Sequence, residues 1–234
     1  MRAAVRRWLD ALCVALALFA ASADANEPMS YLALGDSYTI GEGVPAEARW
    51  PVQLAAASRK HKIALPVPQV IAQTGWTTDE LSAAMDAAQA DGTLKKNYGF
   101  VSLLIGVNNQ YRGRDVFNYR AEFSALLERA IALAHGRADR VLVLSIPDWG
   151  ATPFGQASGR DRATIARELD DYNATAKAIC ARHDVSFVDI TPVSRERGSK
   201  PGMFVDDGLH PSQAMYAAWV KLALPAAERA LSHP

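Results

Sequence analysis

The sequence predicts an α/β fold, a three-layer α/β/α sandwich in which about five parallel strands are covered by helices on both faces. Short apolar runs of strand length alternate along the chain with amphipathic segments of helical period, which is typical of βαβ units. The run Phe100–Ile105 is apolar almost throughout, as expected of a parallel strand that is buried on both faces.

Five strands are predicted at short apolar runs that end near glycine, proline or polar residues. In chain order these runs are Tyr31–Leu34, Gln69–Ala72, Phe100–Ile105, Val141–Leu144 and Val185–Val188. Because a helical segment separates each strand from the next, we expect parallel strands with right-handed crossovers. The glycine-rich and polar loops that follow the strands then gather at one edge of the sheet, where open α/β sheets bind their ligands.

Two helices are predicted in the first half of the chain. One runs from Trp50 to about His61, with Pro51 at a favourable first position. The next is capped by Thr78 or Asp79, residue types that accept hydrogen bonds from free N–H groups at a helix start. The apolar face of this second helix is formed by Leu81, Met85 and Ala88.

Three further helices are predicted in the second half from apolar residues at three- and four-residue spacing. The first ends at Gly136, and its stripe is Phe123, Leu127, Ile131 and Ala134. The second spans roughly Arg160 to His183, with a buried stripe of Ile165, Leu169, Tyr172, Ala176 and Ile179. The last begins near Ser212, and its inward-facing residues are Met215, Trp219 and Leu222.

The first 25 residues have the three parts of a secretory signal peptide. Three arginines within residues 1–7 precede the apolar run Ala11–Ala21, and small residues follow, so cleavage is expected after Ala23 or Ala25. The alternative, a retained membrane anchor, is disfavoured because the run is shorter than the ~20 residues that span a bilayer. The protein is therefore expected to be secreted or periplasmic, without a stable membrane anchor.

Length and composition favour one domain over residues 26–234. The chain has 234 residues, half of them hydrophobic, and contains no internal repeat or composition shift that would mark a second domain. Basic and acidic residues number 25 each, so no basic stripe indicates a nucleic-acid partner. Cys13 lies in the signal segment and Cys180 on an apolar helix face, so neither an internal disulfide nor a metal site is predicted.

A serine nucleophile is one interpretation of Gly35-Asp36-Ser37, which follows the first strand directly. The tripeptide alone is more typical of a simple turn. A serine hydroxyl needs an adjacent general base, and His210 is the candidate among five histidines because it lies in a loop before the last helix. Asp207 precedes it by three residues, so the carboxylate can fold back and orient the imidazole. The alternative for Asp207 is a helix cap.

Two residues are candidates to stabilise the oxyanion that forms when a serine attacks a carbonyl. Gly75 follows the second strand, and its backbone N–H can approach a ligand because no side chain is in the way. Asn108 follows the third strand and offers a side-chain amide donor. Each of these residues is also common in ordinary turns.

Taken in order, four blocks resemble the SGNH or GDSL-type serine hydrolase superfamily, and the resemblance covers essentially residues 26–234. The blocks are Gly35-Asp36-Ser37, Gly75, Gly106-Val107-Asn108 and Asp207-Gly208-Leu209-His210-Pro211. The resemblance implies a flavodoxin-like SGNH hydrolase fold, with Ser37 as nucleophile, His210 as base and Asp207 as its acid. It implies an oxyanion hole formed by the Ser37 N–H, the Gly75 N–H and the Asn108 side chain, with no cofactor or metal.

The chain departs from the usual wording of these motifs at two positions. Tyr38 stands where the motif name has leucine, and Asn109 stands where an aspartate often follows the block asparagine. Other templates fit poorly, because no Gly-x-Ser-x-Gly elbow contains Ser37 and no Gly-x-Gly-x-x-Gly follows the first strand.

The expected function is a serine esterase acting on a small-molecule carboxylic ester through an acyl-serine intermediate, with small or acetylated-carbohydrate esters as substrates. The residues expected to line a substrate site are Trp76, Tyr111, Trp149 and Phe154. Basic residues on the same loops either meet an anionic substrate or are solvated: Arg112, Arg114, Arg195 and Arg197. The alternatives are an acyltransferase with the same triad, a lysophospholipase or thioesterase, and a non-catalytic glycan-binding module.

Overall fold

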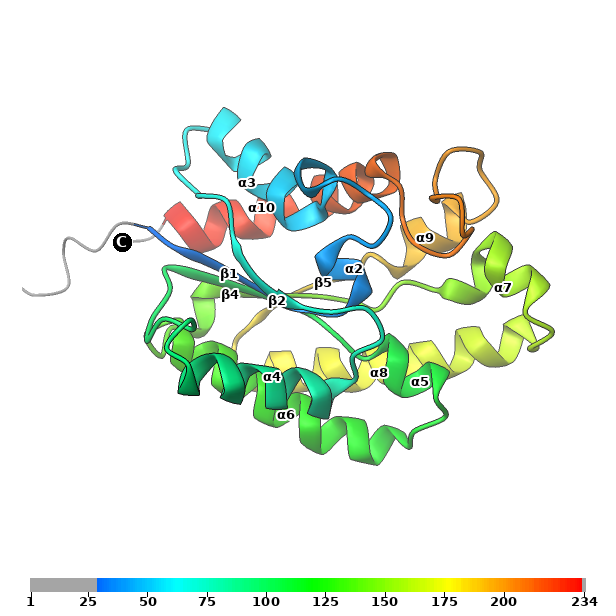
Figure 1. The fold of residues 1–234 in the computed structure, drawn as a ribbon, viewed down its shortest axis with the longest axis horizontal. Coiled ribbons are helices and arrows are strands. Elements are labelled where there is room, and N and C mark those ends of the chain that lie inside the picture. The colour runs from blue at the N-terminus through cyan, green and yellow to red at the C-terminus, as the bar shows by residue number, and fades with distance from the viewer. Residues whose placement is uncertain (1–28, 233–234) are drawn as a thin grey trace, which may run out of the picture.

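A five-stranded parallel sheet lies at the centre of the computed structural model, which describes residues 29–232 (Figure 1). The strands are β1 (Tyr31–Gly35), β2 (Gln69–Ala72), β3 (Phe100–Leu104), β4 (Val141–Leu144) and β5 (Ser186–Val188). Their order across the sheet is β2-β1-β3-β4-β5, so the order reverses between β1 and β3. This confirms the predicted three-layer α/β architecture. The proposed signal peptide, its cleavage sites and Cys13 lie outside the described residues.

The carboxyl ends of the three neighbouring strands β2, β1 and β3 lie level with one another. Gly35 at the end of β1 pairs with Ala72 on one side and with Leu104 on the other. Ligands in open α/β sheets bind at the crevice where the strand order reverses. This register therefore brings the loops that follow β1, β2 and β3 to one place.

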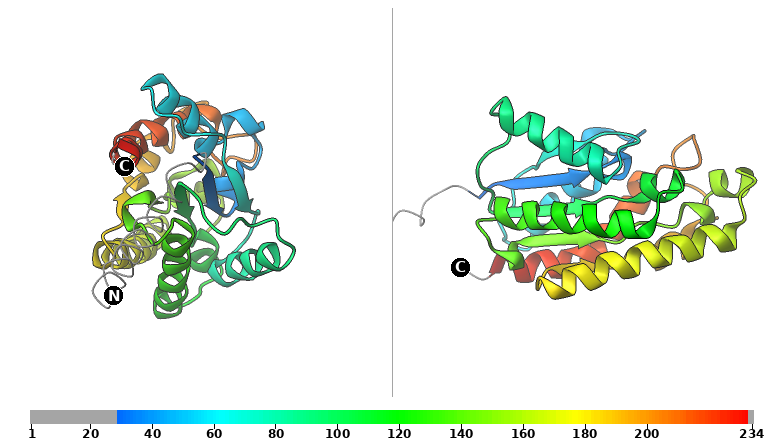
Figure 2. Two further views of the ribbon diagram at one scale, coloured as in Figure 1. Left: turned by 90° about the vertical axis from the view of Figure 1, so that its left-hand side faces the viewer. Right: turned by 90° about the horizontal axis from the view of Figure 1, so that it is seen from below.

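Long helices cover both faces of the sheet (Figures 1 and 2). On one face lie α3 (Trp50–Lys60) and α10 (Gln213–Ser232), which pack against each other. On the other face lie α4 (Thr78–Ala90), α6 (Val116–Leu133) and α8 (Arg162–Arg182). All five residues of the stripe predicted for α8 are buried, and so is Cys180 on the same helix.

Seven short helical segments lie within the connections of the described chain. Four are α-helical: α2 (Ser37–Ile40), α5 (Val107–Tyr111), α7 (Pro153–Ala157) and α9 (Thr191–Arg197). Three are single turns of 3₁₀ helix: Ala46–Ala48, Ala138–Arg140 and Trp149–Ala151. Most of them follow a strand at the carboxyl edge, in segments that the sequence predicts as loops.

Two predictions about helices are wrong in detail. The cap of α4 is Thr77, not Thr78 or Asp79, because Glu80 accepts a hydrogen bond from the Thr77 N–H at 2.8 Å in a capping box. Leu222 does not face inward but is 44% exposed. The buried face of α10 includes Trp219 and Ala223, one turn apart, and Leu222 falls outside it.

Candidate active site

Ser37 is the first residue of α2, immediately after β1 and Asp36. Asp36 caps this helix, since its Oδ1 accepts a hydrogen bond from the Tyr38 N–H at 3.0 Å. A side chain at Gly35 would collide with Thr39 and the Leu104 carbonyl, so glycine allows α2 to lie against the end of β3. The N–H of a first helical residue has no acceptor within its own helix, which leaves the Ser37 N–H available.

Asp207 and His210 form a carboxylate–imidazole pair within one tight turn. Asp207 Oδ2 lies 2.6 Å from His210 Nδ1, and Asp207 Oδ1 accepts hydrogen bonds from the Leu209 and His210 N–H groups at 2.7 and 2.9 Å. Gly208 between them adopts a φ of +67°, which the turn requires. Burial raises the pKa of Asp207, but the hydrogen bonds from His210 and Leu209 outweigh it, so the pKa is lowered overall.

The two candidate oxyanion donors come from the loop after β2 and from α5 after β3. Gly75 has a φ of +87°, and within residues 29–232 its N–H has no protein acceptor. One N–H of the Asn108 amide is donated to the Trp76 carbonyl at 2.9 Å, which fixes the side chain. Because a primary amide carries two N–H bonds, the second stays available.

A pocket of about 200 Å³ brings these groups together. Its lining consists of Ser37, Tyr38, Thr74, Gly75, Val107, Asn108, Tyr111, Trp149, Phe154, Leu209 and His210. In the described chain no hydrogen bond joins the Ser37 hydroxyl to His210, although both side chains line this pocket. In ligand-free enzymes such bonds are often long and tighten only when substrate binds.

Three aromatic side chains form one wall of the pocket. The centroid of the Trp149 ring lies 5.2 Å from the centroid of the Tyr111 ring and 6.1 Å from that of the Phe154 ring. Trp149 is buried, and its Nε1–H donates to Gln110 Oε1 at 2.8 Å. Trp76 was expected beside them, but within the described chain it is not among the lining residues and packs partly buried against the core.

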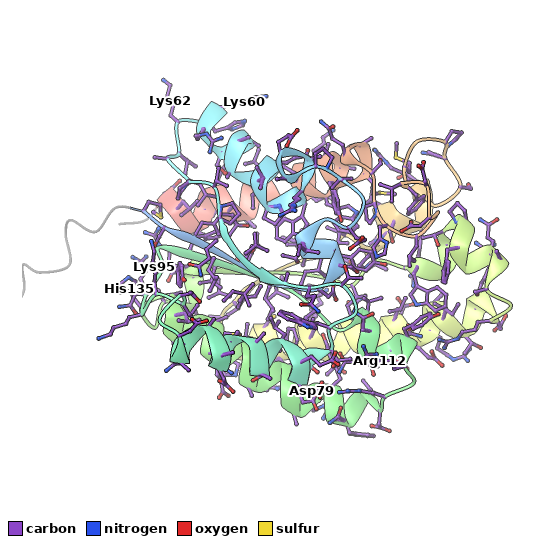
Figure 3. The ribbon with its side chains drawn as sticks, viewed as in Figure 1. Lys60, Lys62, Asp79, Lys95, Arg112 and His135 are labelled. Atoms are coloured by element: carbon purple, nitrogen blue, oxygen red, sulfur yellow. The ribbon has the colours of Figure 1, made fainter. Side chains whose placement is uncertain are left out.

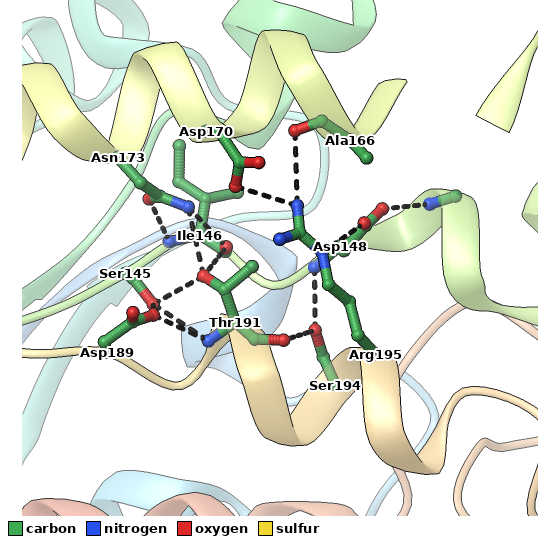
Figure 4. A network of polar contacts seen from close by, with 11 residues as sticks. Ser145, Ile146, Asp148, Ala166, Asp170, Asn173, Asp189, Thr191, Ser194 and Arg195 are labelled. Atoms are coloured by element: carbon green, nitrogen blue, oxygen red, sulfur yellow. Dashed lines mark hydrogen bonds and ion pairs between the residues drawn. The ribbon is translucent and has the colours of Figure 1, made fainter. Parts of the chain in front are cut away.

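A polar network fixes the segment after β4 that carries Trp149 (Figure 4). The Asp148 carboxylate accepts hydrogen bonds from Arg195 Nε at 2.8 Å and from the Gly150 N–H at 2.9 Å. Arg195 also reaches Asp170 Oδ1 at 2.8 Å. Nearby, the Ile146 N–H donates to Asn173 Oδ1 at 2.7 Å. These hydrogen bonds hold the backbone on both sides of Pro147 in place and so fix the position of Trp149 in the pocket wall.

Three of the four arginines considered as anion binders are paired with protein carboxylates. Arg195 pairs with Asp148 and Asp170 as described, and Arg114 lies 2.5 Å from Asp79. Arg112 lies 3.2 Å from Glu80. Their guanidinium groups are therefore already partnered by carboxylates of the protein, and the described lining of the pocket includes none of the three.

Tyr38, Thr74, Val107 and Leu209 line the pocket but were not predicted as site residues. Tyr38 and Thr74 stand directly beside residues of the sequence blocks, and Val107 and Leu209 lie inside two of the blocks, so their proximity was a usable signal. Residues 29–232 contain no group of three or more potential metal ligands, and within that range no helix is long and apolar enough to cross a bilayer.

Comparison with known proteins gives a family match and many structural matches. Residues 33–218 match the model of the GDSL-like lipase/acylhydrolase family. No curated protein matches the sequence. Structural matches include TesA, at 19% identity and a TM-score of 0.66, with 87% of this chain and 100% of TesA covered.

Two further structural matches are described as esterases. The esterase EstA from Pseudoalteromonas sp., inhibited by monoethylphosphonate, is 15% identical with a TM-score of 0.64, and 88% of this chain and 100% of EstA are covered. Axe2, an acetyl xylan esterase from Geobacillus stearothermophilus, is 18% identical with a TM-score of 0.64, and the coverage is 86% and 95%. At these identities the structural matches establish a shared fold.

Proposed function

The chain belongs to the GDSL-like lipase/acylhydrolase family, and from this premise we propose that it hydrolyses carboxylic esters through an acyl-serine intermediate. The observation that carries the proposal is the Asp207–His210 pair, 2.6 Å apart, beside a pocket that His210 shares with Ser37, Gly75 and Asn108. A hydroxyl, a base oriented by a carboxylate, and free donors are the parts that acyl transfer needs.

In the proposed mechanism His210 takes the proton of the Ser37 hydroxyl while the serine oxygen attacks the ester carbonyl. Asp207 stabilises the imidazolium that forms. The oxyanion of the tetrahedral intermediate accepts hydrogen bonds from the Ser37 and Gly75 N–H groups and from Asn108. His210 then protonates the leaving alcohol, and a water molecule repeats the cycle to release the acid and free Ser37.

Ser37→Ala tests the nucleophile. We expect it to abolish hydrolysis of a short-chain p-nitrophenyl ester while the protein stays folded, because Ser37 is the one serine in the described lining of the pocket. Ser199→Ala, at an exposed position outside the pocket lining, is the matched control. An organophosphonate probe should label the native protein at Ser37 only. Undiminished turnover by Ser37→Ala would refute the mechanism, and a native protein that is neither labelled nor active would be a binding module.

For the substrate we propose small esters or acetylated carbohydrates. The pocket is lined largely by apolar and aromatic side chains, and Tyr111, half-exposed at its rim, offers a ring on which a sugar can stack. Axe2 acts on an acetylated polysaccharide, and this chain shares its fold. We further propose that residues 1–25 are removed on export and that residues 26–234 form one hydrolase domain in the periplasm or outside the cell.

A panel of p-nitrophenyl esters of increasing acyl length, together with acetylated sugars, tests this specificity. The expected result is the highest kcat/KM for acetyl and other short acyl groups. A preference for long acyl chains contradicts the proposal and favours a lysophospholipase or thioesterase. Product analysis with an added sugar alcohol separates hydrolysis from acyl transfer to that acceptor.

A further inference from the structure

We propose that Arg112 is a positioning residue for the oxyanion hole. Its guanidinium holds the carbonyl of Gly75, in the peptide group that follows the Gly75 Cα, and thereby restrains the backbone on one side of the residue whose N–H is to be directed into the pocket. The inference rests on the proposed ester hydrolysis, because it assigns a task to Arg112 within that same site.

The Gly75 N–H needs more restraint than its own turn provides, in which the Trp76 N–H donates to the Gln73 carbonyl at 3.2 Å. Gly75 lies in the loop between β2 and α4, with a φ of +87°. Glycine adopts positive and negative φ about equally readily, because it has no Cβ, so the residue itself does not keep its N–H turned to one side. A rotation of the flanking peptide groups would move this donor away from the developing oxyanion.

Arg112 supplies that restraint with two N–H groups. Its Nη2 donates to the Gly75 carbonyl at 2.6 Å, and its Nη1 donates to Glu80 Oε1 at 3.2 Å. The other oxygen of Glu80 accepts the Thr77 N–H at 2.8 Å, so one carboxylate both caps α4 and orients the guanidinium. The planar fork of arginine suits two fixed acceptors, which lysine cannot serve in the same geometry.

The same short helix holds the loop at two further points. Asn108, one turn before Arg112, donates to the Trp76 carbonyl at 2.9 Å, and Asn109 Oδ1 accepts the Thr78 N–H at 3.1 Å. The backbone of residues 75, 76 and 78 is thus bonded to α5 and its C-cap. Figure 3 labels Arg112 beside Asp79 of α4 at the lower centre of the view, away from Lys95 and His135 at the left edge.

The competing role for Arg112 is direct contact with an anionic substrate. Its guanidinium is already engaged by the Gly75 carbonyl and by Glu80, and the described lining of the pocket does not include it. The two roles predict different kinetics. A residue that positions a donor affects the transition state, whereas a substrate contact affects ground-state binding.

Arg112→Ala and Arg112→Lys are compared with the native protein on p-nitrophenyl acetate, a neutral substrate. We expect Arg112→Ala to lower kcat by about 10-fold to 100-fold, since the donor is misplaced and not removed. KM should stay within about 2-fold. Arg112→Lys should recover part of kcat, because an ammonium can still donate to the Gly75 carbonyl. The pH dependence of kcat/KM should not move, since Asp207 and His210 are untouched.

A boronic acid inhibitor gives a second measurement. Its tetrahedral adduct with Ser37 places an oxygen in the oxyanion hole, so its inhibition constant should rise in Arg112→Ala by about the same factor as kcat falls. This readout does not depend on the leaving group. A general loss of folded protein would instead lower the active fraction and leave the inhibition constant unchanged.

Arg129→Ala is the matched control. Arg129 clamps α4 in the same way, donating to the Ser82 carbonyl at 3.1 Å and pairing with Asp86 at 2.7 Å, but it lies outside the pocket lining. It should leave kcat unchanged. The proposal is overturned if Arg112→Ala keeps full kcat, if its loss is confined to KM, or if Arg129→Ala loses as much. Failure of the proposed function is seen separately, as turnover by Ser37→Ala.

Discussion

Asp36 is fully buried beside the candidate nucleophile, and only one of its two carboxylate oxygens has a partner. Oδ1 accepts the Tyr38 N–H, whereas Oδ2 has no hydrogen-bond partner among the described residues. Burial raises the pKa of Asp36 to about 7, and the hydrogen bond from Tyr38 opposes this only in part. An ionised carboxylate at this position is therefore costly to the folded state.

Asp36→Asn should stabilise the protein in a pH-dependent way. An unfolded aspartate ionises near pH 3.9, so the stability that the protonated side chain contributes is lost as the pH rises from about 4 to about 7. The amide keeps an acceptor for the Tyr38 N–H and carries no charge. The free energy of unfolding of the variant relative to the native protein should rise across that range, by at most about 4 kcal/mol, and then level off.

Urea unfolding of both proteins at several values between about pH 4 and pH 8 measures this difference. Asp171→Asn, at an exposed position of α8, is the matched control because it involves no buried carboxylate. A difference between Asp36→Asn and native protein that is the same at every pH would show that the carboxylate is not penalised by burial.

At the scale of single elements, two adjacent residues of α10 differ sharply in burial. Leu222 is 44% exposed, whereas Ala223 is fully buried against the sheet side of the helix. Leu222→Gln should change the free energy of unfolding by less than about 0.5 kcal/mol, as surface substitutions usually do. Ala223→Gln forces a larger polar side chain into a packed core and should cost about 2 kcal/mol or more.

Thermal or urea unfolding of the two variants measures the difference. The comparison is matched, because both substitutions introduce glutamine into the same helix and the two replaced residues have similar helix propensities. Equal losses in both variants would mean that the helix is not oriented as described. A larger loss of unfolding free energy in Leu222→Gln than in Ala223→Gln would support the inward orientation of Leu222 that the sequence predicts.

The strands and long helices could be predicted because their signal is local. Each of the five strands is a short apolar run, and α8 is 21 residues long, enough for the helical period of its stripe to be read. The short helices α2 and α5 have 4 and 5 residues, too few to display a period or to form without tertiary contacts. They form because caps such as Asp36 and the adjoining strand ends hold them.

The cap of α4 was mispredicted for a related reason. Three consecutive residues, Thr77, Thr78 and Asp79, are all good caps, and each can accept a hydrogen bond from an N–H farther along the chain. Glu80 decides between them, because it stands three residues after Thr77 and completes a capping box only there. Reading the pair Thr77 and Glu80 together would have found the helix start.

At the scale of the whole molecule, the sheet order explains why residues far apart in sequence line one pocket. β1 lies between β2 and β3, and their ends are level, so Ser37, Gly75 and Asn108 arrive at one edge. The ordered sequence blocks predicted this set. They could not predict that Arg112 bonds the Gly75 carbonyl across 37 residues, because that contact depends on the path of two loops. The position of Trp76 was unpredictable for the same reason.

The attachment of the Gly75 loop to α5 changes how kinetic losses at Asn108 must be interpreted. In the proposed mechanism, truncating Asn108 removes one oxyanion donor, and it also releases the Trp76 carbonyl, which frees the strand–helix connection that carries Gly75, the other proposed donor. The measured loss then sums two linked effects and exceeds the worth of a single hydrogen bond. If the proposed roles hold, energies assigned to Gly75, Asn108 and Arg112 are non-additive, and the three residues behave as one cooperative unit.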